Sequence, residues 1–244
     1  MWLKKLYDDK LGGLTGRQLL LKVLVGFFGS AVTALGVGLF IASSLGSDPV
    51  SVWLDGLDHT FHFGIGTASM INNCTTLCIA LLFCFKYINI GTVISSVFFS
   101  QALGWFHPLL QDFLAAHPGL VTQAGMIAVG MVLMAAGCAF TVSLRFGFSS
   151  TDSILFRILD FHPRWQYRYI KICSDGVFIT AGFLLGGVIG VGTVVGFVLT
   201  GPAISFFVPI IDRWLLRPLG IDDPHNQQMQ KRAAQEETDK VAAP

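Results

Sequence analysis

A carboxylate and an ammonium group occur inside one of the long apolar stretches of this sequence. Asp175 lies about seven residues, or roughly 10 Å of helix, beyond Arg168. Lys171 precedes Asp175 by four residues and therefore shares its helix face. A carboxylate at the centre of a membrane helix costs about 2.5 to 3.5 kcal/mol, so Asp175 is expected to face protein or water rather than lipid. Two roles remain open: a local ion pair that lets a polar helix pack in a bundle, or a site of proton or ion coupling.

Two shorter segments, 45–57 and 146–158, start near a glycine and continue with residues that favour helix starts. Their candidate binding residues are Ser47, Asp48, Pro49 and Ser51 in the first, and Ser149, Ser150, Thr151 and Asp152 in the second. Each segment predicts a helix of two to three turns with a Ser or Asp cap, and Pro49 fits the first turn. If these helices dip inward, their N-termini bring N–H donors and partial positive charge to a buried site for an anionic group. If they lie flat at the membrane interface, they serve topology alone; the clustered polar residues favour the inward placement.

A polar stripe at helical spacing runs along the apolar stretch 66–85, and it consists of Ser69, Asn72, Asn73 and Thr76. An internal repeat, described below, pairs this stripe with the residues around Asp175, so the two polar surfaces are expected to face each other. Hydrogen bonding between helices is one role for such side chains, and solute binding is the other. Three further candidates are Gln101 within a stretch, and Thr92 and Thr193, which follow glycines at the starts of two stretches. For these threonines a tight turn and a ligand contact both remain open.

No catalytic or metal-binding motif is present in the sequence. It contains no HExxH, GxSxG or Walker loop. All five cysteines lie in apolar stretches without a CxxC pair or a nearby His. We therefore expect neither an enzyme nor a bound metal or cofactor.

The composition describes a membrane protein. Of the 244 residues 53% are hydrophobic and only 13% are charged, and the mean hydropathy is +0.65. A membrane-spanning helix needs about 20 apolar residues. Stretches of that length lie at 19–43, 66–85, 90–109, 120–143, 169–187 and 192–214. These runs are continuously apolar, which excludes a membrane barrel, and the net charge of +1 argues against nucleic-acid binding.

The positive charges predict the orientation of these spans. All Lys and Arg residues lie before or at the start of the first span, between the second and third, in or beside the connection of the fourth and fifth, or at or after the end of the sixth. The connections 43–66, 109–120 and 187–192 contain none. The positive-inside rule therefore places both termini in the cytoplasm.

The second half of the chain repeats the first at an offset of 101 residues. Gly29 falls on Gly130 and Gly36 on Gly137, and the run that starts at Gly91 falls on the run that starts at Gly192. Three spans in each copy require the second copy to enter the membrane from the opposite side, so the repeats are inverted. This arrangement is typical of secondary transporters, whose sites lie near the membrane midplane between the repeats.

The predicted organisation is an all-α membrane protein of six spans in two inverted three-helix repeats, each with an extra short re-entrant or interfacial helix. Its parts are a cytoplasmic basic N-terminus (1–18), a first repeat (19–110), a second repeat (120–214) and a cytoplasmic polar tail (215–244).

Several motifs together resemble a known family. These are a Leu-Gly before a Pro-led short helix, the Gly-x-Gly-Thr at 64–67, and a second Gly-Thr-Val turn, with related residues in both halves. Over residues 20–215 the chain resembles the YczE/YyaS/YitT group of bacterial integral membrane proteins. The group's short helix commonly reads Gly-x-x-Pro-x-Asp; here the first copy has Ser51 in place of Asp, and the second has Ser150 in place of Pro. The resemblance implies a protein of the bacterial cytoplasmic membrane, of a kind usually described as a transporter or exporter.

Three functional hypotheses follow. The first is a secondary transporter that moves a small anionic or zwitterionic solute by alternating access, with H⁺ or Na⁺ as candidate coupling ions. The second is a membrane scaffold or regulatory subunit that does not transport, and the third is a passive channel. A homo-oligomer in the lipid bilayer is compatible with each.

Overall fold

The computed structural model describes residues 16–83, 90–144, 150–161 and 167–216, and side chains within these ranges except at a few positions such as Asp152. The described residues form helices and the turns that join them, with no strand among them, which confirms the all-α prediction. The elements are α2 (Gly16–Ala42), α3 (Pro49–Phe61), α4 (Ile65–Phe83), α5 (Ile90–Ala116), α6 (Leu120–Leu144), α7 (Ser150–Phe161), α8 (Tyr167–Leu184), α9 (Val191–Ile211) and the π-helical turn η2 (Asp212–Leu216). Most of the predicted basic N-terminus and of the polar tail lies outside these ranges.

Five of the six predicted spans are helices long and apolar enough to cross a membrane: α2, α4, α5, α6 and α9. The remaining predicted span, 169–187, corresponds to α8, which has 18 residues and ends at Leu184. Lys171 and Asp175 lie within α8 and lower its mean hydropathy, so it is not among the five. The two expected short helices are present as α3 and α7, with 13 and 12 residues.

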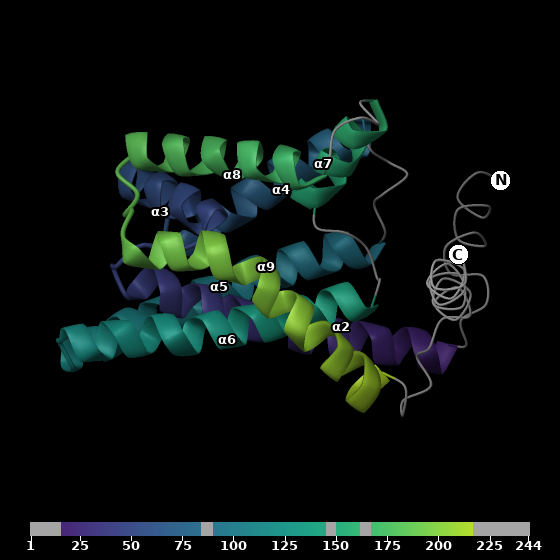
Figure 1. Ribbon diagram of the computed structural model, residues 1–244, viewed down its shortest axis with the longest axis horizontal. Helices are drawn as coiled ribbons and strands as arrows, with labels where there is room; N and C mark the ends of the chain where they lie inside the picture. Colours follow the sequence, from purple (N-terminus) through teal and green to yellow (C-terminus); the bar gives the residue numbers. More distant parts are fainter. Residues whose placement is uncertain (1–15, 84–89, 145–149, 162–166, 217–244) are drawn as a thin grey trace, which may run out of the picture.

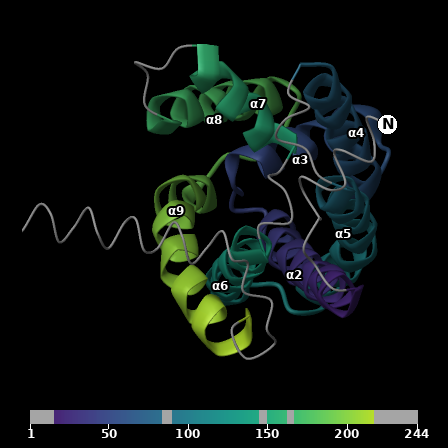
Figure 2. The same cartoon turned by 90° about the vertical axis from the view of Figure 1, so that its right-hand side faces the viewer.

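The long helices lie side by side (Figure 1), and α2 runs between α6 and α5 (Figure 2). It packs against α6 and α5, while α6 also packs against α9, and α5 against α4. Figure 2 looks along the bundle and shows α3 between α8 on one side and α4 and α5 on the other. Both short helices contact α4 and α8. The short helices therefore separate these two longer ones.

Glycines allow α2 and α6 to pack with their backbones in contact. A Cβ placed on Gly36 would lie 2.7 Å from the carbonyl oxygen of Gly130 and 2.8 Å from the Cα of Met134. A Cβ on Gly137 would lie 2.8 Å from the carbonyl oxygen of Gly29. Such close backbone approach is typical of small-residue interfaces between membrane helices. These two glycine pairs fix the crossing of α2 and α6.

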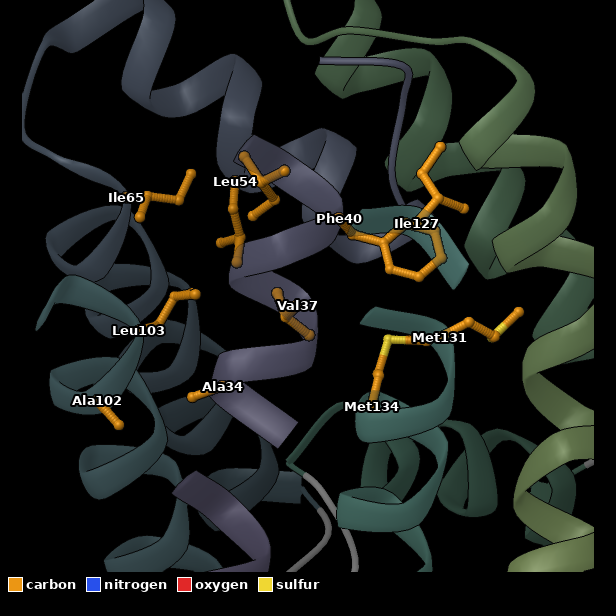
Figure 3. Close-up of a cluster of buried hydrophobic side chains, with 11 residues drawn as sticks. Ala34, Val37, Phe40, Leu54, Ile65, Ala102, Leu103, Ile127, Met131 and Met134 are labelled. Atoms are coloured by element: carbon orange, nitrogen blue, oxygen red, sulfur yellow. The ribbon is translucent and has the colours of Figure 1, made fainter. Parts of the chain in front are cut away.

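The apolar core lies where α2, α5 and α6 meet, and α3 and α4 close it at one end (Figure 3). Its labelled residues are Ala34, Val37, Phe40, Leu54, Ile65, Ala102, Leu103, Ile127, Met131 and Met134. Phe40, Leu103 and Ala34 are fully buried. This core joins α2, α5 and α6 to α3 and to the start of α4.

Candidate functional site

The N-terminus of α3 is capped by the side chain of Asp48. The carboxylate accepts a hydrogen bond from the backbone N–H of Ser51 at 3.4 Å and another from the Ser51 hydroxyl. Pro49 is the first residue of the helix, where its missing N–H costs nothing. Of the two predicted caps, Ser47 and Asp48, the structure selects Asp48, and it buries Ser47 and Ser51 beside it.

Helix α3 begins inside the bundle and runs outward to one end. A Cβ on Gly196, six residues into α9, would lie 3.1 Å from the Cα of Asp48. A Cβ on Gly56 would lie 3.0 Å from the Cα of Gly182 near the end of α8. At the C-terminal end of α3, the Thr60 hydroxyl donates to the carbonyl of Leu185, beyond α8, at 2.8 Å. The polar N-terminus of α3 therefore lies among helices rather than on the end of the bundle.

A charged centre lies between this N-terminus and α8. The Lys171 ammonium nitrogen is 2.9 Å from a carboxylate oxygen of Asp175, so the ion pair that the spacing allows is formed. The Asp175 side chain is 11% exposed and that of Lys171 is 36% exposed. Asp48 interacts electrostatically with both members of the pair. Two carboxylates and one ammonium group thus share one region of the interior.

Two carboxyl groups of α3 bind protons more readily than in water. Burial raises the pKa of Asp48 above its ordinary value, and the hydrogen bonds from Ser51 oppose this shift. Burial likewise raises the pKa of Asp55, and a hydrogen bond from the backbone N–H of Val188, at 2.8 Å, opposes it. Both carboxyl groups are therefore suited to taking up a proton.

The polar stripe on α4 forms hydrogen bonds with α5. The hydroxyls of Ser69 and Ser100 are 3.0 Å apart, and the Asn73 amide donates to the Ser100 hydroxyl at 3.0 Å. The Asn73 amide also donates to the carbonyl of Ser96 at 3.4 Å. For this part of the stripe the predicted hydrogen bonding between helices is confirmed.

The remaining stripe residues contact the two short helices. Trp53 of α3 donates its indole N–H to the side-chain oxygen of Asn72 at 3.1 Å. The hydroxyl of Thr76 lies 2.8 Å from the hydroxyl of Ser150, the first residue of α7. The expectation that this stripe faces the polar residues of α8 directly is wrong, because α3 and α7 lie between α4 and α8. The stripe nevertheless contacts both short helices, since Asn72 contacts the first half of α3 and Thr76 contacts the start of α7.

Comparison of the sequence with known protein families identifies the family of this chain. Residues 20–209 match the model described as "Family of unknown function (DUF6198)". The chain belongs to this family. No solved structure matches the chain.

Three curated bacterial relatives of this DUF6198 member resemble it over most of their length. The chain is 27% identical to the "Uncharacterized membrane protein YczE" of Bacillus subtilis over 79% of the chain and 88% of that protein. It is 24% identical to the "Uncharacterized protein YyaS" of the same organism over 77% and 92%. It is 26% identical to an "Uncharacterized protein" of Haemophilus influenzae over 76% and 83%. The resemblance inferred from the motifs is confirmed for YczE and YyaS, and the chain is a multi-pass membrane protein.

The other predicted site residues of this DUF6198 protein separate into three groups. Thr193 is buried, and its hydroxyl accepts from the backbone N–H of Gly190 at 3.3 Å, so it takes part in the tight turn that starts α9. Thr92 is buried and Thr151 half-buried. Gln101 is exposed, with its amide 3.6 Å from the sulfur of Met70, so it does not point into the centre. Ser149 and the side chain of Asp152 lie outside what the structure describes.

Sequence reasoning missed two polar partners in this DUF6198 fold. Trp53 is half-buried and was not singled out, although its indole N–H needs an acceptor there, and Asn72 supplies it. His107 was also missed; it is 6% exposed in α5. The signal that could have found His107 is its place in a long apolar stretch directly before Pro108, where the helix hydrogen bonding is interrupted.

Proposed function

We propose that this protein is a secondary transporter of a small zwitterionic solute in the bacterial cytoplasmic membrane. The observation that carries the proposal is the charged centre formed by Asp48, Lys171 and Asp175 at the inner end of a short helix. Ionisable residues within membrane helices mark solute or ion pathways by default, because burying them is costly. Short helices that begin inside the bundle are the elements from which many transporter sites are built.

The glycine contacts support two repeats related by a pseudo-twofold axis. At the offset of 101 residues, Gly29 corresponds to Gly130 and Gly36 to Gly137. The close approach of Gly29 to Gly137 therefore corresponds to the close approach of Gly130 to Gly36, and both occur. A twofold relation between the halves requires such reciprocal contacts.

The packing of the other helices follows the same relation. The pair α2 and α5 corresponds to α6 and α9, and the pair α3 and α8 corresponds to α7 and α4; all four pairs are in contact. Ser150 at the start of α7 lies beside Thr76, and Ile154 packs against Leu77 and Ala80 nearer the end of α4. Helix α7 thus also begins beside the middle of a long helix. In this proposal α8 also spans the membrane, which brings the number of spans to six, because α3 and α7 cover its polar side.

The charges favour a zwitterion over the anion that the helix N-termini alone suggest. At α3 the capping position is already filled by the Asp48 carboxylate. Two carboxylates then offer a place for a solute ammonium group, and Lys171 offers one for a solute carboxylate. A proton is the coupling ion we favour, because the raised pKa of Asp48 makes its proton uptake accessible.

The test is solute uptake into liposomes that contain the purified protein and an internal pH-sensitive dye. The panel consists of amino acids, betaines, simple carboxylates and simple amines, each added with an inward proton gradient and again with a sodium gradient. We expect zwitterions to produce a saturable pH change that Asp175→Asn abolishes and Asp48→Asn reduces at least tenfold. Asp112→Asn is the matched control, since Asp112 is an exposed carboxylate of α5, and it should transport normally.

Several outcomes would overturn the proposal. One is the absence of solute-dependent flux for the whole panel from correctly inserted wild-type protein. Normal flux in both Asp48→Asn and Asp175→Asn would remove the centre from the mechanism. Single-channel currents in a planar bilayer would indicate a passive channel, and stoichiometric co-purification of a partner without any flux would indicate a scaffold.

A further inference from the structure

A cavity of about 250 Å³ lies at the end of the bundle where α3 joins α4. It is lined by Asp58, the turn 63–67, and one face of α5 that carries Gly104, His107, Pro108 and Gln111. Asp58 lies ten residues, or about 15 Å of helix, from Asp48. The cavity is therefore separate from the charged centre described above.

His107 is the most unusual residue of this cavity. It is 6% exposed, and its Nε2 atom has no hydrogen-bond partner among the residues that the structure describes. A buried nitrogen without a partner costs free energy, so such groups in native proteins usually serve a ligand, an ordered water or an ion. His107 lines the cavity, and a turn of its ring would bring Nε2, which exposes almost no surface, to an occupant of the cavity.

Three further acceptors surround the same space. One Asp58 carboxylate oxygen accepts from the backbone N–H of Gly64 at 2.7 Å, and a carboxylate has further acceptor positions for a ligand. Gln111 contributes an amide oxygen. In α5, the carbonyl of Gly104 cannot receive the usual helical hydrogen bond from residue 108, because Pro108 has no N–H.

The turn before α4 gives the cavity an aromatic wall. His62 and Gly64 adopt left-handed conformations with φ of 55° and 82°, and Phe63 between them lines the cavity. The ring of Phe63 stacks on that of Phe61 with centroids 5.2 Å apart. An aromatic face attracts a cation. The connections 43–66 and 109–120 contain no Lys or Arg, and no residue lining the cavity is a Lys or Arg.

We propose that this cavity binds a small organic ammonium ion, with Asp58 supplying the opposite charge and His107 Nε2 and the Gly104 carbonyl accepting N–H bonds. An anion would meet a carboxylate and no positive group there. Since liquid water occupies about 30 Å³ per molecule, the volume corresponds to about eight waters and suits a compact ligand of a few heavy atoms. The proposal is independent of transport.

The experiment is isothermal titration of the purified full-length protein with ethanolammonium chloride at constant ionic strength. Tetramethylammonium chloride, sodium acetate and sodium chloride are the comparison ligands. We expect saturable binding of ethanolammonium, at least fivefold weaker binding of tetramethylammonium because it lacks N–H donors, and none of acetate. Asp58→Asn should weaken ethanolammonium binding at least tenfold, and Asp112→Asn, which removes an exposed carboxylate of α5 outside the cavity, should change it less than twofold.

Pro108→Ala separates a loss of binding from a loss of folding. The alanine N–H restores the helical bond to the Gly104 carbonyl, so the helix should become more stable while ethanolammonium binds several-fold more weakly. Reduced binding together with an unchanged or higher melting temperature would support the proposal. Absence of saturable ethanolammonium binding would show that the cavity holds water only and would overturn it. Equal losses in Asp58→Asn and Asp112→Asn, or binding of acetate as tight as that of ethanolammonium, would also overturn it.

Discussion

The backbone contact between α2 and α6 can be tested by adding one methyl group. In Gly36→Ala, the new Cβ would lie 2.7 Å from the Gly130 carbonyl oxygen and 2.8 Å from the Met134 Cα. The backbone nitrogen of Met134 would lie closer still, so the helices would have to separate by more than about 0.6 Å, the difference between 2.8 Å and the 3.4 Å at which ordinary contact begins. These neighbours are all backbone atoms, so no side chain can rotate away to relieve the clash.

The expected change in stability follows from two opposing contributions. Overpacking of a close contact costs about 1 to 3 kcal/mol, and the upper end applies where backbone meets backbone. Replacing Gly by Ala inside a helix gains about 1 kcal/mol. Gly36→Ala should therefore lower the free energy of unfolding by about 2 kcal/mol. For a chain of this size that corresponds to a melting temperature lower by about 4 to 8 °C.

Gly26→Ala is the matched control for this prediction. Gly26 is also buried and lies on the same helix, but its added Cβ would meet only the Leu144 Cδ1 at 3.7 Å, an ordinary contact. It should gain about 1 kcal/mol and melt about 2 to 4 °C higher than the wild type. Thermal unfolding of both purified variants in the same mild detergent measures the difference. Melting temperatures within 1 °C of each other would refute the close α2–α6 contact and the reciprocal glycine pairs derived from it.

Two further predictions concern the charged centre. Lys171→Met should destabilise the protein by about 1 to 3 kcal/mol, since it leaves a mostly buried carboxylate without its cation. Adding Asp175→Asn to this variant should restore most of the lost stability. Thermal unfolding measures both effects, and a double variant as unstable as the single one would contradict the prediction. Because burial raises the folded-state pKa of Asp48 above its ordinary value, the folded state binds the proton more tightly than the unfolded state. The contribution of Asp48 to stability is therefore present at low pH and falls as pH rises through the folded-state pKa. The variant Asp48→Asn should therefore lose less stability than the wild type between pH 4 and pH 8, as measured by unfolding at a series of pH values, and identical pH profiles would argue against a perturbed Asp48.

Features set by neighbouring residues in the chain could be predicted from the sequence alone. Apolar length determines where long helices form, because the bilayer demands about 20 such residues. Asp48 followed by Pro49 determines where α3 begins, because capping acts over three residues. The four-residue spacing determines the pairing of Lys171 with Asp175, because helix geometry alone brings such side chains together.

Contacts between distant residues were decided by the tertiary structure. Asp48 approaches the Lys171 and Asp175 pair from more than 120 residues away, and Trp53 rather than α8 contacts Asn72. The sequence could not predict these contacts because a membrane helix is apolar on all sides, so its pattern does not reveal which face meets protein and which meets lipid. The rotation and depth of each helix are set by close packing, as at Gly36 and Gly130. The sequence therefore determined the elements and their local polar groups, and packing of glycine against backbone determined which of those groups meet.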